Sequence, residues 1–171
     1  MRRTVKKLLC HVRNERGGTL AELAILAPFL VLMFAVVSEV GLYFQRYTTL
    51  AKATRTAARY LSNHQYNALE KGRAKSLVVC GKLACNGNDA LVKGLEMDNV
   101  CIQTTLTPVG TVETVTVSIP RQASVTCDGD ETATYLRYTP VFNIGALIGN
   151  QDFSMAFPMP PSTTMRYIPA E

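Results

Sequence analysis

The stretch LAILAPFLVLMFAVV, residues 23–37, decides the architecture of this chain because it is long, apolar and uncharged. No Lys or Arg occurs anywhere in residues 17–45. A helix over residues 19–44 rises about 1.5 Å per residue, so it is longer than the ~30 Å hydrocarbon core of a bilayer. The sequence therefore predicts one transmembrane helix, which we assign to residues 18–44.

The net charge of +5 is concentrated in front of this apolar stretch. Residues 1–17 hold six Lys or Arg residues and one Glu, and the rest of the chain has no net charge. A nucleic-acid-binding protein spreads its cations over a folded face, so the charge does not indicate a nucleic acid partner. Cations instead flank the cytoplasmic end of a membrane helix. We expect residues 1–17 to be a cytoplasmic leader, and the chain beyond the helix to lie on the periplasmic or extracellular side.

Two other kinds of segment can be this apolar. A secretory signal peptide has an apolar core of ~7–15 residues followed by a small-residue cleavage site, whereas this run is longer and no convincing Ala-x-Ala site follows it. A buried helix of a soluble protein needs no basic leader. The predicted anchor also ends in aromatic residues suited to the far interface, namely Tyr43, Phe44 and Tyr47. The membrane helix is therefore favoured.

The five cysteines divide between the two sides of the predicted membrane. Cys10 lies in the leader, and four lie beyond the helix: Cys80, Cys85, Cys101 and Cys127. Four cysteines in one outer domain predict two disulfides and an oxidising compartment. A zinc site would need closely paired cysteines or histidine ligands, and His64 is the only histidine on that side. Of the three possible pairings we favour Cys80–Cys85 with Cys101–Cys127.

Helical periodicity continues beyond the membrane. A stripe of mostly apolar residues at steps of three and four predicts a helical stem over residues 45–64. The stripe begins just before the stem and consists of Tyr43, Tyr47, Leu50, Thr54, Ala57 and Leu61. The cations Lys52, Arg55 and Arg59 fall on the opposite face. A second helix is expected over residues 67–79, before Gly81.

The remaining chain has the period of two that is typical of strands. In residues 100–106, the apolar residues Val100, Ile102 and Leu106 alternate with Cys101 and polar residues. In residues 115–119, the apolar residues alternate with Thr116 and Ser118. The turn signal PVG at 108–110 predicts an antiparallel hairpin. Further strands are expected in residues 132–142 and 162–168. The predicted fold class is α+β: a long N-terminal transmembrane and stem helix, a short second helix, and an antiparallel sheet of three or four strands in a domain over residues 65–171.

The junction between leader and helix reads RGGTLAELA over residues 16–24. A basic leader, a glycine, and an apolar helix with Glu as its fifth residue resemble the prepilin processing site of type IV pilins. Cleavage after Gly17 would make Gly18 the new N-terminus and Glu22 the fifth residue of the mature chain. A cut after Gly18 would make Glu22 the fourth, so the first register is preferred. The resemblance implies that Glu22 compensates the ammonium group of a neighbouring subunit.

The resemblance extends through AELA at 21–24, Pro28, EVG at 39–41 and AARY at 57–60. These residues resemble the N-terminal signature of TadE-like proteins, with TadF-like proteins as near neighbours. The family implies a pilin-like minor pseudopilin of the tight-adherence (Tad, Flp) type IV pilus, made at the bacterial inner membrane and either incorporated into the pilus or needed to start it. The implied partners are a prepilin peptidase, other pilins and pseudopilins, an inner-membrane assembly platform and membrane lipid.

The sequence offers no chemistry of its own. It contains no phosphate-binding glycine loop, no metal-binding histidine cluster and no nucleophile–base pair, so we expect neither an enzyme, nor a cofactor, nor a metal. The segment DGDE at 128–131 lacks the spaced ligands of a calcium loop and is expected to be a solvated turn. Two other functions stay open: an unprocessed anchor whose outer domain is a structural subunit of an envelope secretion machine, and a membrane-tethered enzyme or sensor.

Overall fold

The computed structural model of the protein describes residues 15–85, 89–122, 124–128, 131–142 and 156–168, with side chains from residue 18 onward. The chain divides into two compact units, Met1–Gly41 and Leu42–Glu171. Residues 1–14 of the predicted leader, with Cys10, lie outside the described part.

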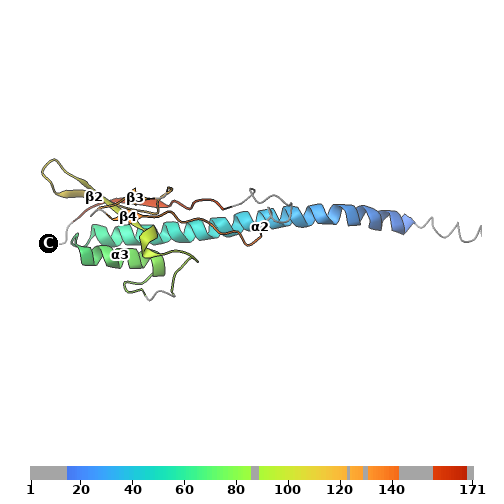
Figure 1. Ribbon diagram of the computed structural model, residues 1–171, viewed down its shortest axis with the longest axis horizontal. Coiled ribbons are helices and arrows are strands. Elements are labelled where there is room, and N and C mark those ends of the chain that lie inside the picture. Colours follow the sequence, from blue (N-terminus) through green and yellow to red (C-terminus); the bar gives the residue numbers. More distant parts are fainter. Residues whose placement is uncertain (1–14, 86–88, 123, 129–130, 143–155, 169–171) are drawn as a thin grey trace, which may run out of the picture. The chain divides into compact units, whose positions relative to one another are not determined.

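Helix α2 spans Glu15–Ser62 and is coloured blue to cyan in Figure 1. In the first unit most of its apolar side chains are exposed, and its most apolar window contains no buried residue. Leu32, Ala35 and Val36 are half-buried. The core helix of a soluble protein would bury one face, whereas a mostly exposed apolar helix of this length fits a single-pass membrane anchor. The large apolar residues with over half of their surface exposed are Leu20, Leu23, Ile25, Leu26, Phe29, Leu30, Val31, Phe34, Val37 and Val40.

Polar groups in this part of α2 are few. The Ser38 hydroxyl donates to the Phe34 carbonyl over 2.8 Å, which satisfies the hydroxyl within the helix. Pro28 lies inside the helix, a position where membrane helices tolerate proline. Glu39, near the end of the unit, has a side chain that is only 1 % exposed.

In the second unit the rest of α2 becomes the central core helix. Leu50, Thr54, Ala57 and Leu61 are fully buried, as the predicted stripe requires, and Ala53 and Ala58 widen it. Lys52, Arg55 and Arg59 are exposed on the other side. The segment predicted as a stem is thus the end of the continuous helix α2, as far as Ser62, and part of the core.

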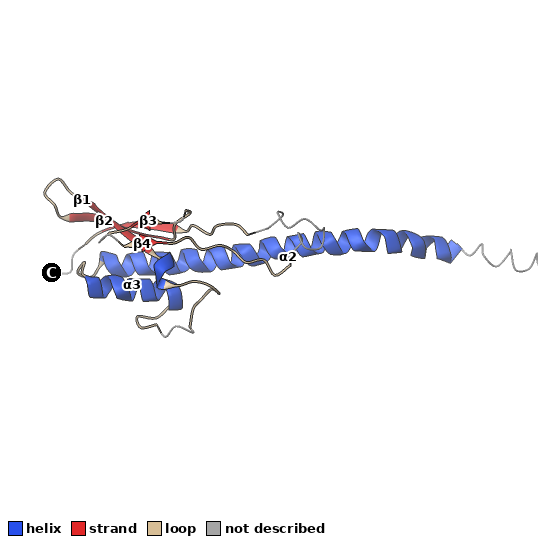
Figure 2. Cartoon of the chain, viewed as in Figure 1, coloured by secondary structure: helices blue, strands red, loops and turns tan. Residues whose placement is uncertain are grey.

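Helix α3, Ala68–Cys80, packs back along α2 after a five-residue connection. Figure 2 shows the two helices side by side. Asn67 caps its first turn, since the side-chain oxygen accepts from the Glu70 amide at 2.8 Å. Gly81 ends it with φ of 71°, a left-handed conformation that glycine adopts without strain. Both ends fall within a residue of the prediction.

Three strands form the main sheet in the order β1-β2-β5, all antiparallel: β1 Cys101–Leu106, β2 Val112–Ser118 and β5 Ser162–Arg166. The turn between β1 and β2 places Gly110 at φ of 83°. Val115, Val117 and Ile119 point into the core with Tyr138 and Met159. The 3₁₀ turn η1, Met97–Asn99, precedes β1, and a second small sheet pairs β3, Val125–Thr126, with β4, Thr132–Ala133. The predicted α+β class is confirmed.

The prediction of a strand over residues 132–142 is mostly wrong. Only Thr132–Ala133 is a strand, and Arg137 forms an isolated bridge with Pro158. The segment opposite carries Pro158, Pro160 and Pro161, which have no N–H to donate, so a ladder cannot extend there. Leu106, predicted on the buried face of its strand, is instead 58 % exposed, beyond the register shift between Thr105 and Leu106.

Candidate functional site

The predicted processing site lies in the first turns of α2. The helix already includes Gly17 and Gly18, so the junction is helical in the intact chain. Consecutive glycines weaken a helix by about 1 kcal/mol each relative to alanine. The two adjacent glycines therefore lower the intrinsic helix propensity of this first turn. A Cβ atom added at Gly18 would have nothing within 4 Å.

Glu22 is exposed on the helix four residues after Gly18. Residues four apart lie on the same helix face, about one turn from each other. A carboxylate among exposed apolar side chains is costly in a bilayer, by ~2.5–3.5 kcal/mol at its centre on the insertion scale. Glu22 and Gly18 lie one turn apart on the same face of α2.

The four cysteines of the outer domain form two disulfides. Cys80 pairs with Cys85 just after α3, with Cα atoms 5.7 Å apart. Cys101, the first residue of β1, pairs with Cys127 beside β3, with Cα atoms 5.5 Å apart. The second bond ties the main sheet to the small one. These are the two pairs that the sequence favoured. Together the two bonds use all four sulfur atoms, so none of the four is a free thiolate for zinc.

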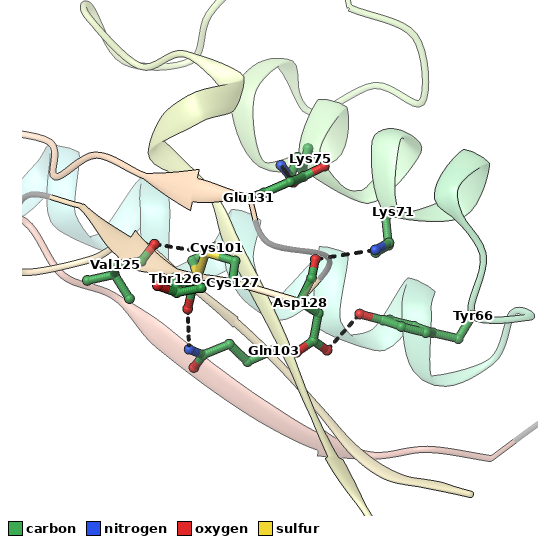
Figure 3. The surroundings of a disulfide bond; sticks show 10 residues. All are labelled: Tyr66, Lys71, Lys75, Cys101, Gln103, Val125, Thr126, Cys127, Asp128 and Glu131. Carbon is green, nitrogen blue, oxygen red and sulfur yellow. Dashed lines mark hydrogen bonds and ion pairs between the residues drawn. A yellow bond between two sulfur atoms is a disulfide. The ribbon is translucent and has the colours of Figure 1, made fainter. Parts of the chain in front are cut away.

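Beside the second disulfide, Asp128 accepts hydrogen bonds from β1, from α3 and from the connection before α3. Figure 3 shows the contacts with Tyr66 and Lys71. The Asp128 Oδ2 accepts from the Tyr66 hydroxyl over 2.9 Å, and from the Thr104 hydroxyl of β1. Its backbone carbonyl accepts from Lys71 of α3 over 3.4 Å. Gln103 reaches the Thr126 carbonyl nearby. The segment 128–131 was expected to be a solvated turn. Asp128 does lie in a turn and is only half-buried, but its side chain is also held by hydrogen bonds from the domain.

Burial and the hydrogen bond to Asp128 raise the pKa of Tyr66 well above its ordinary value. The proton therefore stays on the phenol, which keeps it a donor to the carboxylate. The Lys71 ammonium lies 5.4 Å from the centre of the Tyr66 ring and adds a cation–π contact. This cluster orients α3 on the sheet.

A second link between α3 and the small sheet is the ion pair of Lys75 with Glu131. The hydrogen bond from Lys75 lowers the pKa of the Glu131 carboxyl. Glu131 remains 55 % exposed, and exposed ion pairs contribute less than about 1 kcal/mol. The pair therefore aligns the elements more than it stabilises them.

The chemistry available to the described residues is limited. They contain no group of three His, Cys, Asp or Glu side chains that could hold a metal ion. A groove of about 250 Å³ between α2 and α3 is lined mostly by Thr, Ala and Leu side chains, with Lys52 at its rim.

Sequence reasoning missed the roles of Tyr66, Lys71 and Asp128. Tyr66 lies 62 residues before its partner Asp128, and no local period links them. The only available signal was Asp128 following Cys127, since a disulfide holds its neighbours in place. The structure brings Cys101, Cys127 and this cluster together in the second unit, whereas Gly17, Gly18 and Glu22 belong to the first.

Fold and site together indicate a class: a protein with one long apolar helix that fits a single-pass membrane anchor, followed by a disulfide-bonded α+β domain. The model of the TadE-like protein family matches residues 17–59, from the glycine junction into the core helix, which confirms the predicted resemblance. No curated protein and no solved structure matches the chain at a significant level. The family similarity points to a Tad pilus-associated protein, in a structural class and not a known enzyme family.

Proposed function

We propose that this protein is a minor pseudopilin, cut after Gly17 by a prepilin peptidase, that takes part in assembling or priming a Tad/Flp-type pilus. The observation that carries the proposal is the match to the TadE-like family, which starts at Gly17 itself. The exposed apolar helix that follows supports it, because such a helix can be held by lipid first and by other subunits afterwards.

The role of Glu22 follows from the same geometry. After the cut, the α-amino group of Gly18 is a cation at the end of an apolar helix. A neighbouring subunit's Glu22 carboxylate pairs with it, since two unlike charges in a low-dielectric environment attract strongly and each unpaired charge is costly. The pair therefore fixes the axial register in which a new subunit adds to the assembly.

The first experiment determines the N-terminal sequence and intact mass of the protein from membranes, with and without a co-expressed prepilin peptidase. We expect a peptidase-dependent N-terminus at Gly18. Gly17→Ala should block the cut. Gly18→Ala is the matched control, because the added methyl group meets nothing within 4 Å, and it should be processed. An N-terminus at Met1 in all samples would identify a permanent anchor of an envelope machine instead.

Glu22→Ala tests the assembly step separately. We expect it to be cut normally yet to reduce pilus assembly, and Glu22→Asp to retain more assembly than the alanine variant because the charge remains. Pili would be quantified by shearing and electron microscopy. Normal assembly by Glu22→Ala would contradict the charge-pairing mechanism and leave the processing result intact.

A further inference from the structure

Exposed apolar side chains gather at one end of the second unit. Three of its segments contribute to this aromatic patch, which we define as residues 43–47, 138–142 and 157–158. Its large exposed members are Phe44, Val141, Phe142 and Phe157, with 64, 61, 49 and 53 % of their surface exposed. The first segment lies about a hundred residues before the other two, so only the fold brings it beside them.

Hydrogen bonds hold the three segments side by side. The Tyr43 hydroxyl donates to the Pro158 carbonyl over 3.3 Å, and the Arg46 guanidinium donates to the Thr139 carbonyl over 3.3 Å. Loops tied by both hydrogen bonds and ring packing keep a fixed shape. The apolar side chains of the patch are therefore presented by a rigid surface.

Ring contacts anchor the patch to the core. The Tyr43 ring meets Tyr138 edge-on, with centroids 5.5 Å apart, and Phe157 with centroids 6.3 Å apart. Tyr138 is 1 % exposed and belongs to the main core cluster. The Arg46 guanidinium lies 4.9 Å above the Tyr138 ring. The patch thus has a buried aromatic base and an exposed apolar rim.

The charge of the patch is of one sign. Residues 42–48, 136–142 and 156–161 contain Arg46 and Arg137 as their charged residues, with no Asp or Glu. The Arg137 guanidinium donates to the Ala156 carbonyl over 3.2 Å, which holds it at the same end. Cations interspersed with aromatic rings suit the headgroup region of a bilayer, where anionic lipids attract Arg and amphipathic rings settle.

The patch also continues the membrane anchor along the chain. Phe44 follows Gly41, the last residue of the first unit, by three residues of α2, a rise of about 4.5 Å in a helix. We propose that the aromatic patch lies in the headgroup region of the outer leaflet, so that segments 138–142 and 157–158 join Tyr43, Phe44 and Tyr47 as a membrane-interface contact. This contact sets the depth and rotation of the outer domain before assembly, and it does not depend on cleavage at Gly17.

The chain has no Trp, which allows a clean test. Phe157→Trp places one fluorophore in the patch, and Val109→Trp places a control at the β1–β2 turn, where the native side chain is 87 % exposed and equally apolar. Each full-length variant is reconstituted in nanodiscs of phosphatidylcholine and phosphatidylglycerol, with phosphatidylcholine brominated at the headgroup end of its acyl chains. We expect blue-shifted emission and several-fold stronger quenching for Phe157→Trp than for Val109→Trp.

Phe142→Trp provides a second probe from the other segment, which keeps the test decisive if one variant misfolds; circular dichroism checks each fold. Water-like emission and weak quenching at both probes would overturn the proposal. Blue-shifted emission without bromine quenching would also overturn it, because it would place protein, such as a second copy of this chain, over the patch. Quenching at both probes but not at Val109→Trp would support it.

Discussion

Glu22 and Asp128 are acidic residues with opposite surroundings, and their surroundings explain their roles. Glu22 is exposed among apolar side chains of α2, so its charge is available to another molecule. Asp128 is surrounded by donors from Tyr66 and Thr104 of its own domain, so its charge is used within the fold. Glu39 differs from both, since it is 1 % exposed.

Tyr66→Phe should lower the free energy of unfolding of the outer domain by about 1.5–3 kcal/mol, because the Asp128 carboxylate loses a donor. The measurement is denaturant unfolding of the full chain in detergent. Tyr135→Phe is the control, since the Tyr135 hydroxyl makes no hydrogen bond within the described residues. Equal losses for the two variants would contradict the role given to Tyr66.

Comparing the natural protein with Tyr66→Phe also gives a prediction for the pH dependence of stability. The pKa of Tyr66 is raised in the folded state, so its stabilisation is complete below the unfolded value of 10.0 and declines as the pH rises above it. The difference in unfolding free energy between the natural protein and Tyr66→Phe should therefore shrink above pH 10.0. A difference that grows with pH in that range would show the opposite sign of coupling.

At the scale of elements, α2 performs two tasks with one helix. Its first part exposes most of its apolar residues, and its second part buries a single stripe under the sheet and α3. Disulfides and helix caps stabilise the smaller elements. Their expected contributions to the free energy of unfolding differ, and the structure predicts their order.

The two disulfides should differ in their effect on stability. Chain-entropy estimates give about 3.5 kcal/mol for the Cys101–Cys127 bond, whose cysteines are 26 residues apart, and about 2 kcal/mol for Cys80–Cys85, which are 5 apart. Replacing each pair with alanines and measuring denaturant unfolding should therefore give the larger loss for Cys101→Ala/Cys127→Ala. The reverse order would show that native packing, not loop closure, determines the effect.

Two glycines at α3 should respond to alanine in opposite directions. Gly72 lies inside the helix with nothing within 4 Å of an added Cβ, so Gly72→Ala should stabilise by about 0.5–1 kcal/mol. Gly81 has φ of 71°, so Gly81→Ala should destabilise by about 1 kcal/mol. Thermal unfolding of both variants checks the pair, and a shift in the same direction for both would contradict the cap assignment.

At the scale of the whole molecule, the chain combines a lipid-compatible helix with a domain that needs oxidation. Because thiols are kept reduced in the cytoplasm, we expect the disulfide-bonded domain to lie outside it. The oxidation state of the four cysteines and the predicted orientation of the membrane helix are therefore linked.

Topology can be measured with reporters fused to the C-terminus. Alkaline phosphatase, which folds only under oxidising conditions, should be active there, and a reporter that fluoresces only in the cytoplasm should be dark. Replacing the leader cations Arg2, Arg3, Lys6 and Lys7 with Gln should lower the fraction of correctly oriented chains. Full activity of a cytoplasmic reporter in the natural protein would reverse the orientation.

The sequence by itself determined the anchor helix, the buried stripe of α2, both ends of α3, the β1–β2 hairpin and the α+β class. These features depend on periods of 3.6 and 2 and on caps and turns, which act between residues close in the chain. The tertiary structure alone decided the links of Tyr66 and Lys71 to Asp128, the short pairing around Arg137 and Pro158, and the gathering of the aromatic patch. Each joins segments about twenty or more residues apart. The partner there is chosen by packing around a shared core and leaves no periodic trace in the sequence.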